Sequence, residues 1–311
     1  DCMTVGEAPG STPEVARLFT DPEREELNMI FTFEHMNIDR IPGSVNRKWA
    51  LKPFDLRDLK RVMSEWQNKL YNKGWNALYF ENHDQPRVIS RWGNDTTYRE
   101  ECAKAYATVL HGMQGTPYVY QGEEIGMTNV QFPLDEYEDI EVRNAYQDLV
   151  VKNKTISEDD FHKAVWNKSR DNARVPMQWD DSENAGFTTG KPWFRLSDRY
   201  QEINVKKALE KNDSVFYYYK DLICLRHEEE LLTEGDYQLL LPEDEKIFAY
   251  LRTSDKEQWI VVANLSEDTV STEGLVKYVS DKEDIKIANY KDRTGIKEDL
   301  RPYEAFMMRI R

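Results

Sequence analysis

Cysteine is scarce in this sequence. The chain has three cysteines among 311 residues, at Cys2, Cys102 and Cys224. They are too few and too far apart to suggest a disulfide framework or a metal site. Proteins of reducing compartments have this cysteine usage, so we expect a cytoplasmic protein. Long apolar runs are missing as well. None approaches the roughly 18 residues of a membrane-spanning helix, so we expect no membrane partner.

Positively charged residues are also fewer than negatively charged ones. The chain carries 42 Lys and Arg against 57 Asp and Glu, which gives a formal net charge of −15. Because proteins that bind nucleic acid present a basic face to the phosphates, we expect no nucleic-acid partner. The sequence also shows no Cys/His cluster at zinc spacing, no calcium-loop pattern and no glycine-rich phosphate loop. We therefore expect no metal and no cofactor in this chain.

Strand and helix patterns alternate over the larger, N-terminal part of the chain. Short apolar runs that are typical of buried strands occur at residues 2–6, 29–33, 77–80 and 118–120. Apolar positions at helical spacing occur at 55–73, 98–112 and 204–229. Strands that alternate with helices predict a parallel sheet in an α/β domain. Residues 131–172 are polar and contain two weak helical segments.

The pattern changes near residue 233. Short apolar segments between polar turns occur at 237–241, 247–251, 259–263 and 305–308. Such segments predict an antiparallel β-sandwich. We therefore place one domain at residues 1–232 and a second domain at residues 233–311.

Polar side chains follow two of the predicted strands directly. The run at 77–80 leads to His83 and Asp84, and the run at 2–6 leads to Glu7. Active sites of parallel α/β barrels lie at the carboxyl ends of the strands, and a pair of carboxylates is the machinery of glycoside hydrolysis. The pattern alone also allows a helix-capping role for Glu7 and a turn motif at Asp84.

Five segments resemble the α-amylase family of retaining α-glycosidases, glycoside hydrolase family 13. In the family's order they are VGEAPG, FTFEHM, ENHDQPR, GTPYVYQGEEIGMTN and SRDNARVPMQWDD. Within the family, the chain resembles the oligo-1,6-glucosidase and dextran glucosidase branch, over nearly its whole length. The resemblance implies the C-terminal half of a (β/α)8 TIM barrel, strands five to eight, followed by the β-sandwich domain.

The resemblance also assigns roles to individual residues. It implies that Glu7 is the general acid/base on barrel strand five. Asp84, on strand seven, would bind the 2- and 3-hydroxyls of the sugar, and His83 would donate to the same sugar. Further substrate-binding roles fall on Phe33, Glu34, Glu141, Arg170 and Arg174. The two arginines compete for one position that closes the pocket around the terminal glucose.

One member of the family's site has no counterpart in this sequence. The family's nucleophile is an aspartate on barrel strand four, in a segment that would precede residue 1. We therefore expect the chain to be part of a longer enzyme, completed by an N-terminal half-barrel as a covalent or non-covalent partner. The chain as given lacks the nucleophile. A calcium site of the family would also lie in that N-terminal half.

The resemblance implies that the parent protein is a retaining α-glucosidase. It would release glucose from short α-1,6-linked oligosaccharides such as isomaltose, so the expected partner is an α-glucoside. Trehalose-6-phosphate hydrolase and α-1,4-glucosidase are the alternative activities, because linkage choice depends partly on the residue after the nucleophile. Sucrose isomerase is a weaker alternative, since the arginine-rich loop of that enzyme has no clear match at residues 37–44. A catalytically inactive scaffold is the non-enzyme alternative, and the presence of Glu7 and Asp84 argues against it.

Overall fold

Four short parallel strands form the first sheet of the computed structural model, which describes residues 2–279 and 283–311. The strands are β1 (Val5–Glu7), β2 (Met29–Phe31), β3 (Asn76–Leu78) and β4 (Thr116–Pro117). They lie in the order β1-β2-β3-β4, and each pairs with the next in parallel. The predicted parallel sheet is confirmed, and its strands end at one common edge.

The fourth strand lies earlier than the sequence pattern predicts. Thr116 and Pro117 pair with β3, whereas the pattern places this strand at 118–120. The N–H of Tyr118 still donates to the carbonyl of Leu78 over 2.8 Å. Proline has no N–H to donate, so this next residue supplies the bond. Residues 119 and 120 then belong to the loop that leaves the sheet.

Helices connect the four strands and pack against them. The connections are α1 (Pro13–Thr20), α2 (Leu56–Leu70), α3 (Val88–Trp92) and α4 (Arg99–His111). Helix α2 begins after Asp55, whose side chain accepts a hydrogen bond from the N–H of Arg57. This cap satisfies one free donor of the first turn. The apolar faces of α2 and α4 are buried in the main core, which confirms the helices predicted at 55–73 and 98–112.

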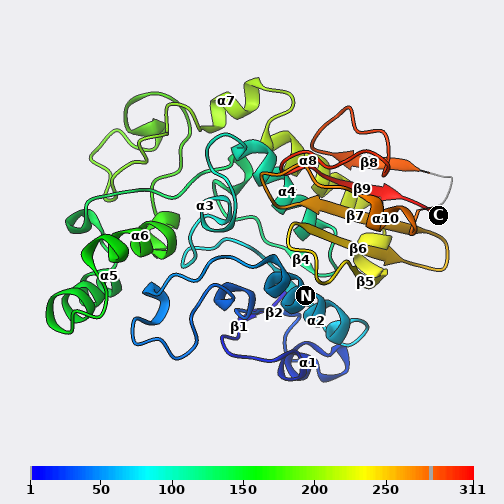
Figure 1. Cartoon of the computed structure of the whole chain (residues 1–311), viewed down its shortest axis with the longest axis horizontal. Coiled ribbons are helices and arrows are strands. Elements are labelled where there is room, and N and C mark those ends of the chain that lie inside the picture. Colours follow the sequence, from blue (N-terminus) through cyan, green and yellow to red (C-terminus); the bar gives the residue numbers. More distant parts are fainter. Residues whose placement is uncertain (1, 280–282) are drawn as a thin grey trace.

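A second, smaller core lies in the segment after β4. Helices α5 (Ile140–Ala145) and α6 (Glu158–Lys168) flank a wider helical turn at Tyr146–Lys152. They bury Phe161 and Tyr137 among other apolar side chains. Figure 1 shows α5 and α6 (green) on the side of the molecule away from the second sheet. The weak helical pattern of this polar region therefore marks real helices.

The predicted helix at 204–229 is interrupted. It consists of α7 (Val205–Glu210) and α8 (Val215–Glu228), and the N–H of Ser214 closes a turn onto the carbonyl of Lys211. Asn, Asp and Ser side chains bond to nearby backbone in non-helical conformations, which favours a turn at this point. Residues 210–214 are all polar, but apolar positions at helical spacing on both sides of them conceal the break. Helix α8 then packs against α4.

The C-terminal part of the chain forms one antiparallel sheet. Helix α9 (Leu231–Glu234) leads into it. Its strands are β5 (Asp236–Leu240), β6 (Ile247–Thr253), β7 (Gln258–Asn264), β8 (Asp284–Ala288) and β9 (Ala305–Arg309). Their order is β5-β6-β7-β9-β8. The antiparallel architecture is confirmed, and β8 is an additional strand that the pattern did not reveal.

The prediction of a β-sandwich is corrected to a single sheet within the described residues. Along β7, Trp259 faces the main core, to which α2 and α4 also contribute, and Ile260 faces a third core. That third core is closed by Leu275 of α10 (Glu273–Val276) and by loop residues such as Leu300. A short helix and loops therefore take the place of a second sheet. No helix in the described part of the chain is long and apolar enough to span a bilayer.

Candidate active site

Asp84 lies in the loop that follows β3, between two guanidinium groups. The side chain of Asn82 accepts a hydrogen bond from the N–H of Asp84 over 2.8 Å, which shapes this turn. Nη2 of Arg174 lies 2.5 Å from Oδ1 of Asp84, and Nη1 of Arg170 lies 3.6 Å from the same oxygen. The Asp84 side chain is 41% exposed. The fold thus brings together three predicted site residues and leaves the carboxylate open to a ligand.

Arg170 is anchored on its other side to the start of α5. Its Nε donates to Asp139 over 2.9 Å, and its Nη2 donates to Glu141 over 2.9 Å. Asp139 caps α5 by accepting from the N–H of Glu141. Burial opposes the charge of Arg170, but the facing carboxylates outweigh burial and raise the pKa of its side chain. Arg170 is therefore held as a fixed cation that points one N–H toward Asp84.

Glu141 also binds Lys48, a residue that was not among the predicted site residues. Nζ of Lys48 lies 2.5 Å from Oε2 of Glu141 and 4.6 Å from the ring centre of Trp49. Burial alone would raise the pKa of Glu141, but hydrogen bonds from Lys48 and Arg170 hold it below its ordinary value. A lone lysine before a tryptophan has no motif that could have revealed this role. The structure adds Lys48 to the candidate site.

His83 lies beside Asp84 at the surface. Its ring is 63% exposed, and Nε2 lies 3.9 Å from Oδ2 of Asp84. Nε of Arg174 donates to the backbone carbonyl of His83 over 3.1 Å. His83, Asp84 and Arg174 therefore form one group, in which the imidazole is free to meet a ligand.

Glu7 reaches the same edge of the sheet from β1, two strands away from β3. Its side chain is exposed. Burial, and then the negative charge of Glu7, raise the pKa of the Tyr79 hydroxyl. The Phe33 ring lies edge to face against Tyr79, with 6.0 Å between the ring centres. Glu7 and Phe33 thus share one neighbour, and they lie where strands β1 and β2 end.

Glu34 points away from this group. Its Oε2 accepts a hydrogen bond from Nε1 of Trp66 over 3.0 Å, and Arg61 lies 3.9 Å from Oε1. Both partners belong to α2, so these contacts fasten the loop after β2 onto that helix. The structure does not bring Glu34 to Asp84. The ligand role of Glu34 stays a prediction.

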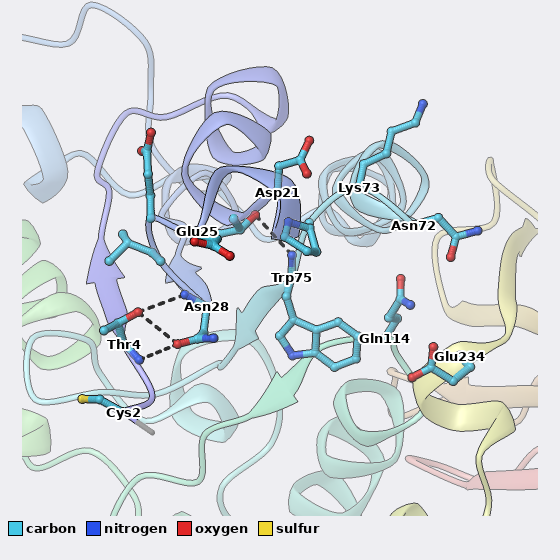
Figure 2. Close-up of a pocket in the computed structure, with 15 residues that line it drawn as sticks. Cys2, Thr4, Asp21, Glu25, Asn28, Asn72, Lys73, Trp75, Gln114 and Glu234 are labelled. Atoms are coloured by element: carbon cyan, nitrogen blue, oxygen red, sulfur yellow. Dashed lines mark hydrogen bonds between the residues drawn. The ribbon is translucent and has the colours of Figure 1, made fainter.

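A cavity of about 640 Å³ lies at the opposite end of the strands. Figure 2 shows Thr4, Asn28 and Trp75 around it, and each of these residues directly precedes a strand. Thr4 and Asn28 bond to each other through backbone and side chain, over 2.8 and 3.0 Å. In parallel α/β sheets, ligands bind outside the carboxyl ends of the strands. The cavity is therefore separate from the group around Asp84.

No three His, Cys, Asp or Glu side chains converge as potential metal ligands within residues 2–279 and 283–311. The groups that face Asp84 are arginines and an imidazole. The arginines can only donate hydrogen bonds and the carboxylate of Asp84 can accept them, so the group can bind a ligand that both accepts and donates.

Comparison with known proteins places this geometry in a family. The family model described as "Alpha amylase, catalytic domain" matches residues 1–235, and "Maltogenic Amylase, C-terminal domain" matches residues 237–281. An oligo-1,6-glucosidase of Heyndrickxia coagulans is 59% identical over 305 residues, which are 98% of this chain and 54% of that protein. A trehalose-6-phosphate hydrolase of Bacillus subtilis is 42% identical over the full chain and 55% of that protein.

Solved structures show the same arrangement. The trehalose-6-phosphate hydrolase of Bacillus licheniformis has a TM-score of 0.90 at 41% identity, covering 99% of this chain and 56% of that one. Isomaltulose synthase of Klebsiella sp. LX3 has a TM-score of 0.91 at 37% identity, covering 99% and 55%. The chain therefore spans about half the length of the relatives it matches.

Proposed function

The chain belongs to the alpha-amylase family, and from this premise we propose that it is part of a retaining α-glucosidase. In this proposal, residues 1–232 supply strands five to eight of a (β/α)8 barrel, and residues 233–311 form the second domain. Four parallel strands joined by helices support the half-barrel. The two family matches meet near residue 236, which supports the boundary. The scarcity of cysteine supports a cytoplasmic location.

The proposed activity is release of glucose from short α-1,6-linked oligosaccharides such as isomaltose. One observation carries it: Asp84 is held by Arg174 and Arg170 beside an exposed His83, on the same sheet edge as Glu7. Relatives of 47–59% identity that bear the name oligo-1,6-glucosidase support the choice of substrate.

The proposed mechanism divides the work between two carboxyl groups. Glu7 gives its proton to the glycosidic oxygen as the bond from that oxygen to the anomeric carbon breaks. An aspartate of the N-terminal half-barrel, which would complete the site, forms the bond to the anomeric carbon. Glu7 then takes a proton from water as the water oxygen displaces that aspartate. The anomeric carbon is substituted twice, so its configuration is retained.

Asp84 assists both steps in this proposal. Its carboxylate accepts hydrogen bonds from the 2- and 3-hydroxyls and stabilises the positive charge that develops on the sugar ring. His83 donates to the same sugar. Arg170 closes the pocket around the terminal glucose, and Arg174 orients Asp84. The proposed contacts to the leaving sugar are Phe33, Glu34, Glu141 and Lys48.

Hydrolysis of trehalose 6-phosphate is the nearest alternative, because a relative with that name is 42% identical. A phosphate group needs cations that are free to bind it. Lys48 is already paired with Glu141, and Arg170 is paired with Asp139 and Glu141. This pairing occupies Lys48 and Arg170 and so favours an uncharged oligosaccharide.

A substrate panel tests the proposal with the full-length protein that contains this chain. We expect the highest kcat/KM on isomaltose, with lower values on maltose, trehalose 6-phosphate and sucrose. A preference for maltose would identify an α-1,4-glucosidase instead. Failure to cleave any of the four sugars would support the inactive scaffold.

A further inference from the structure

A buried ion pair closes the base of the loop that carries His83 and Asp84. Nη1 of Arg87 donates to Oε2 of Glu81 over 2.9 Å, and the N–H of Val88 donates to Oε1 over 2.9 Å. The side chains of Arg87 and Glu81 are 0% and 2% exposed. One member of the pair precedes the loop and the other follows it. The pair thus fixes both ends of the loop that presents Asp84.

The same arginine is joined to the loop after β4. Nη1 of Arg87 also donates to the carbonyl of Gln121 over 2.9 Å. Its guanidinium carbon lies 5.1 Å from the ring centre of Tyr120, a cation–π contact. The N–H of Tyr120 donates to Oε2 of Glu123 over 3.0 Å. Arg87 therefore fixes the ring of Tyr120, and Glu123 fixes its backbone.

The hydroxyl of Tyr120 extends in the other direction, to the loop at 170–174. It donates to the carbonyl of Ala173 over 2.9 Å. The next residue is Arg174, which donates to the carboxylate of Asp84 and to the carbonyl of His83. Tyr120 thus spans the gap between the buried ion pair and the arginine that holds Asp84.

We propose that Tyr120 is a positioning residue whose hydroxyl sets Arg174 against Asp84. This inference rests on the proposed function, because it concerns the residue that would bind the sugar hydroxyls. Arg174 donates a hydrogen bond to Oδ1 of Asp84, and Oδ2 of Asp84 faces His83. If the carbonyl of Ala173 loses its donor, the turn that carries Arg174 is free to shift. Asp84 then loses the orientation in which it would meet two adjacent hydroxyls.

The ring and the hydroxyl of Tyr120 contact different parts of the structure, so their roles can be tested separately. The ring packs on Arg87, so it supports the fold, whereas the hydroxyl donates to the loop at 170–174. Tyr120→Phe removes the hydroxyl and keeps the ring. A matched control is Tyr250→Phe, which removes a hydroxyl that donates to the carbonyl of Val109 over 2.7 Å, between α4 and the second sheet.

Crystal structures of the two variants, made in the full-length protein, test the inference first. We expect Tyr120→Phe to lengthen the distance from Arg174 Nη2 to Asp84 Oδ1, and Tyr250→Phe to leave it unchanged. An unchanged distance in Tyr120→Phe would overturn the inference. The distance is measured whether or not the protein is active. An inactive wild-type protein would therefore reject the proposed function, while the crystal structures would still show whether Tyr120 positions Arg174.

Kinetics then test whether Tyr120 acts through Arg174. Loss of one neutral hydrogen bond predicts a kcat/KM for isomaltose about tenfold lower in Tyr120→Phe, with wild-type activity in Tyr250→Phe. In an Arg174→Ala background, Tyr120→Phe should cause no further loss, because residues that act through one another are not additive. Independent, additive losses in the double variant would contradict the inference.

Discussion

The guanidinium of Arg174 lies 2.5 Å from the carboxylate of Asp84, although ninety positions separate the two residues in the sequence. The loop after β3 and the loop at 170–174 meet at this contact. Asp84 therefore depends on a distant segment for its orientation, and the candidate site is assembled by the fold rather than by one motif.

Glu7→Gln tests the general acid. The variant keeps the size of the side chain and removes the transferable proton, so kcat on isomaltose should fall by about 10²- to 10⁴-fold. An activated aryl α-glucoside needs little protonation of its leaving group, so its first step should be much less affected. Glu23→Gln, an exposed residue of a surface turn, is the control. Wild-type turnover of isomaltose by Glu7→Gln would reject the role of Glu7.

Asp84→Asn tests the second carboxylate. The amide is isosteric but uncharged, so it stabilises the developing positive charge less, and we expect kcat/KM to fall about 10²-fold or more. Thermal unfolding should change little, because the Asp84 side chain is 41% exposed. The exposed Asp159→Asn is the comparison. Equal activities of the two variants would show that Asp84 has no catalytic task.

Glu123→Gln tests whether the buried carboxyl group next to Tyr120 holds a proton. Burial, and then the negative charge of Glu81, raise the pKa of Glu123 from 4.5 to about 8. Between these values the folded state keeps a proton that the unfolded state releases. This contribution to stability is therefore complete below pH 4.5 and is lost as pH rises toward 8, with a slope of up to about 1.4 kcal/mol per pH unit. Glu123→Gln should remove that slope.

The measurement is chemical unfolding of wild type, Glu123→Gln and the exposed Glu243→Gln between pH 5 and 9. The Glu243 variant should follow wild type. If Glu123→Gln keeps the wild-type dependence on pH, Glu123 does not carry the proton.

Lys60→Met tests the contact between α2 and the turn that joins β5 to β6. Nζ of Lys60 donates to the carbonyls of Leu241, Asp244 and Ile247 over 2.6, 2.5 and 3.2 Å. Methionine fills the same space but leaves those carbonyls without their donor, so we expect a loss of about 2 kcal/mol in the free energy of unfolding. Lys73→Met, at an exposed site, should be near neutral. If Lys60→Met and wild type have the same free energy of unfolding, the three carbonyls do not need the Lys60 ammonium group as a donor.

The sequence predicted elements well where apolar periodicity was strong. Helices α2 and α4 carry continuous apolar faces and lie where expected. Strand β8 was missed because Ile285 and Ile287 are separated and flanked by charged residues, which also occurs in surface loops. The β-sandwich was wrong for a different reason. Local patterns identify strands, but only long-range pairing decides whether they form one sheet or two.

The candidate site was predictable where a motif brings several polar residues together. Asp84 and His83 follow a buried strand, and Arg170 and Arg174 lie in one recognisable segment. Lys48 and Tyr120 were not predictable, because each is a single residue whose role depends on a partner far away in sequence. Such roles follow from tertiary packing and cannot be read from local spacing.

The configuration of the released sugar shows whether the protein is a retaining α-glucosidase. Full-length protein containing this chain is mixed with isomaltose, and proton NMR follows the anomeric signals before mutarotation equilibrates them. We expect the glucose formed by cleavage at the α-1,6 bond to be seen first as the α-anomer, because the reaction proceeds with retention. Initial release of the β-anomer, or no cleavage of isomaltose, would contradict it.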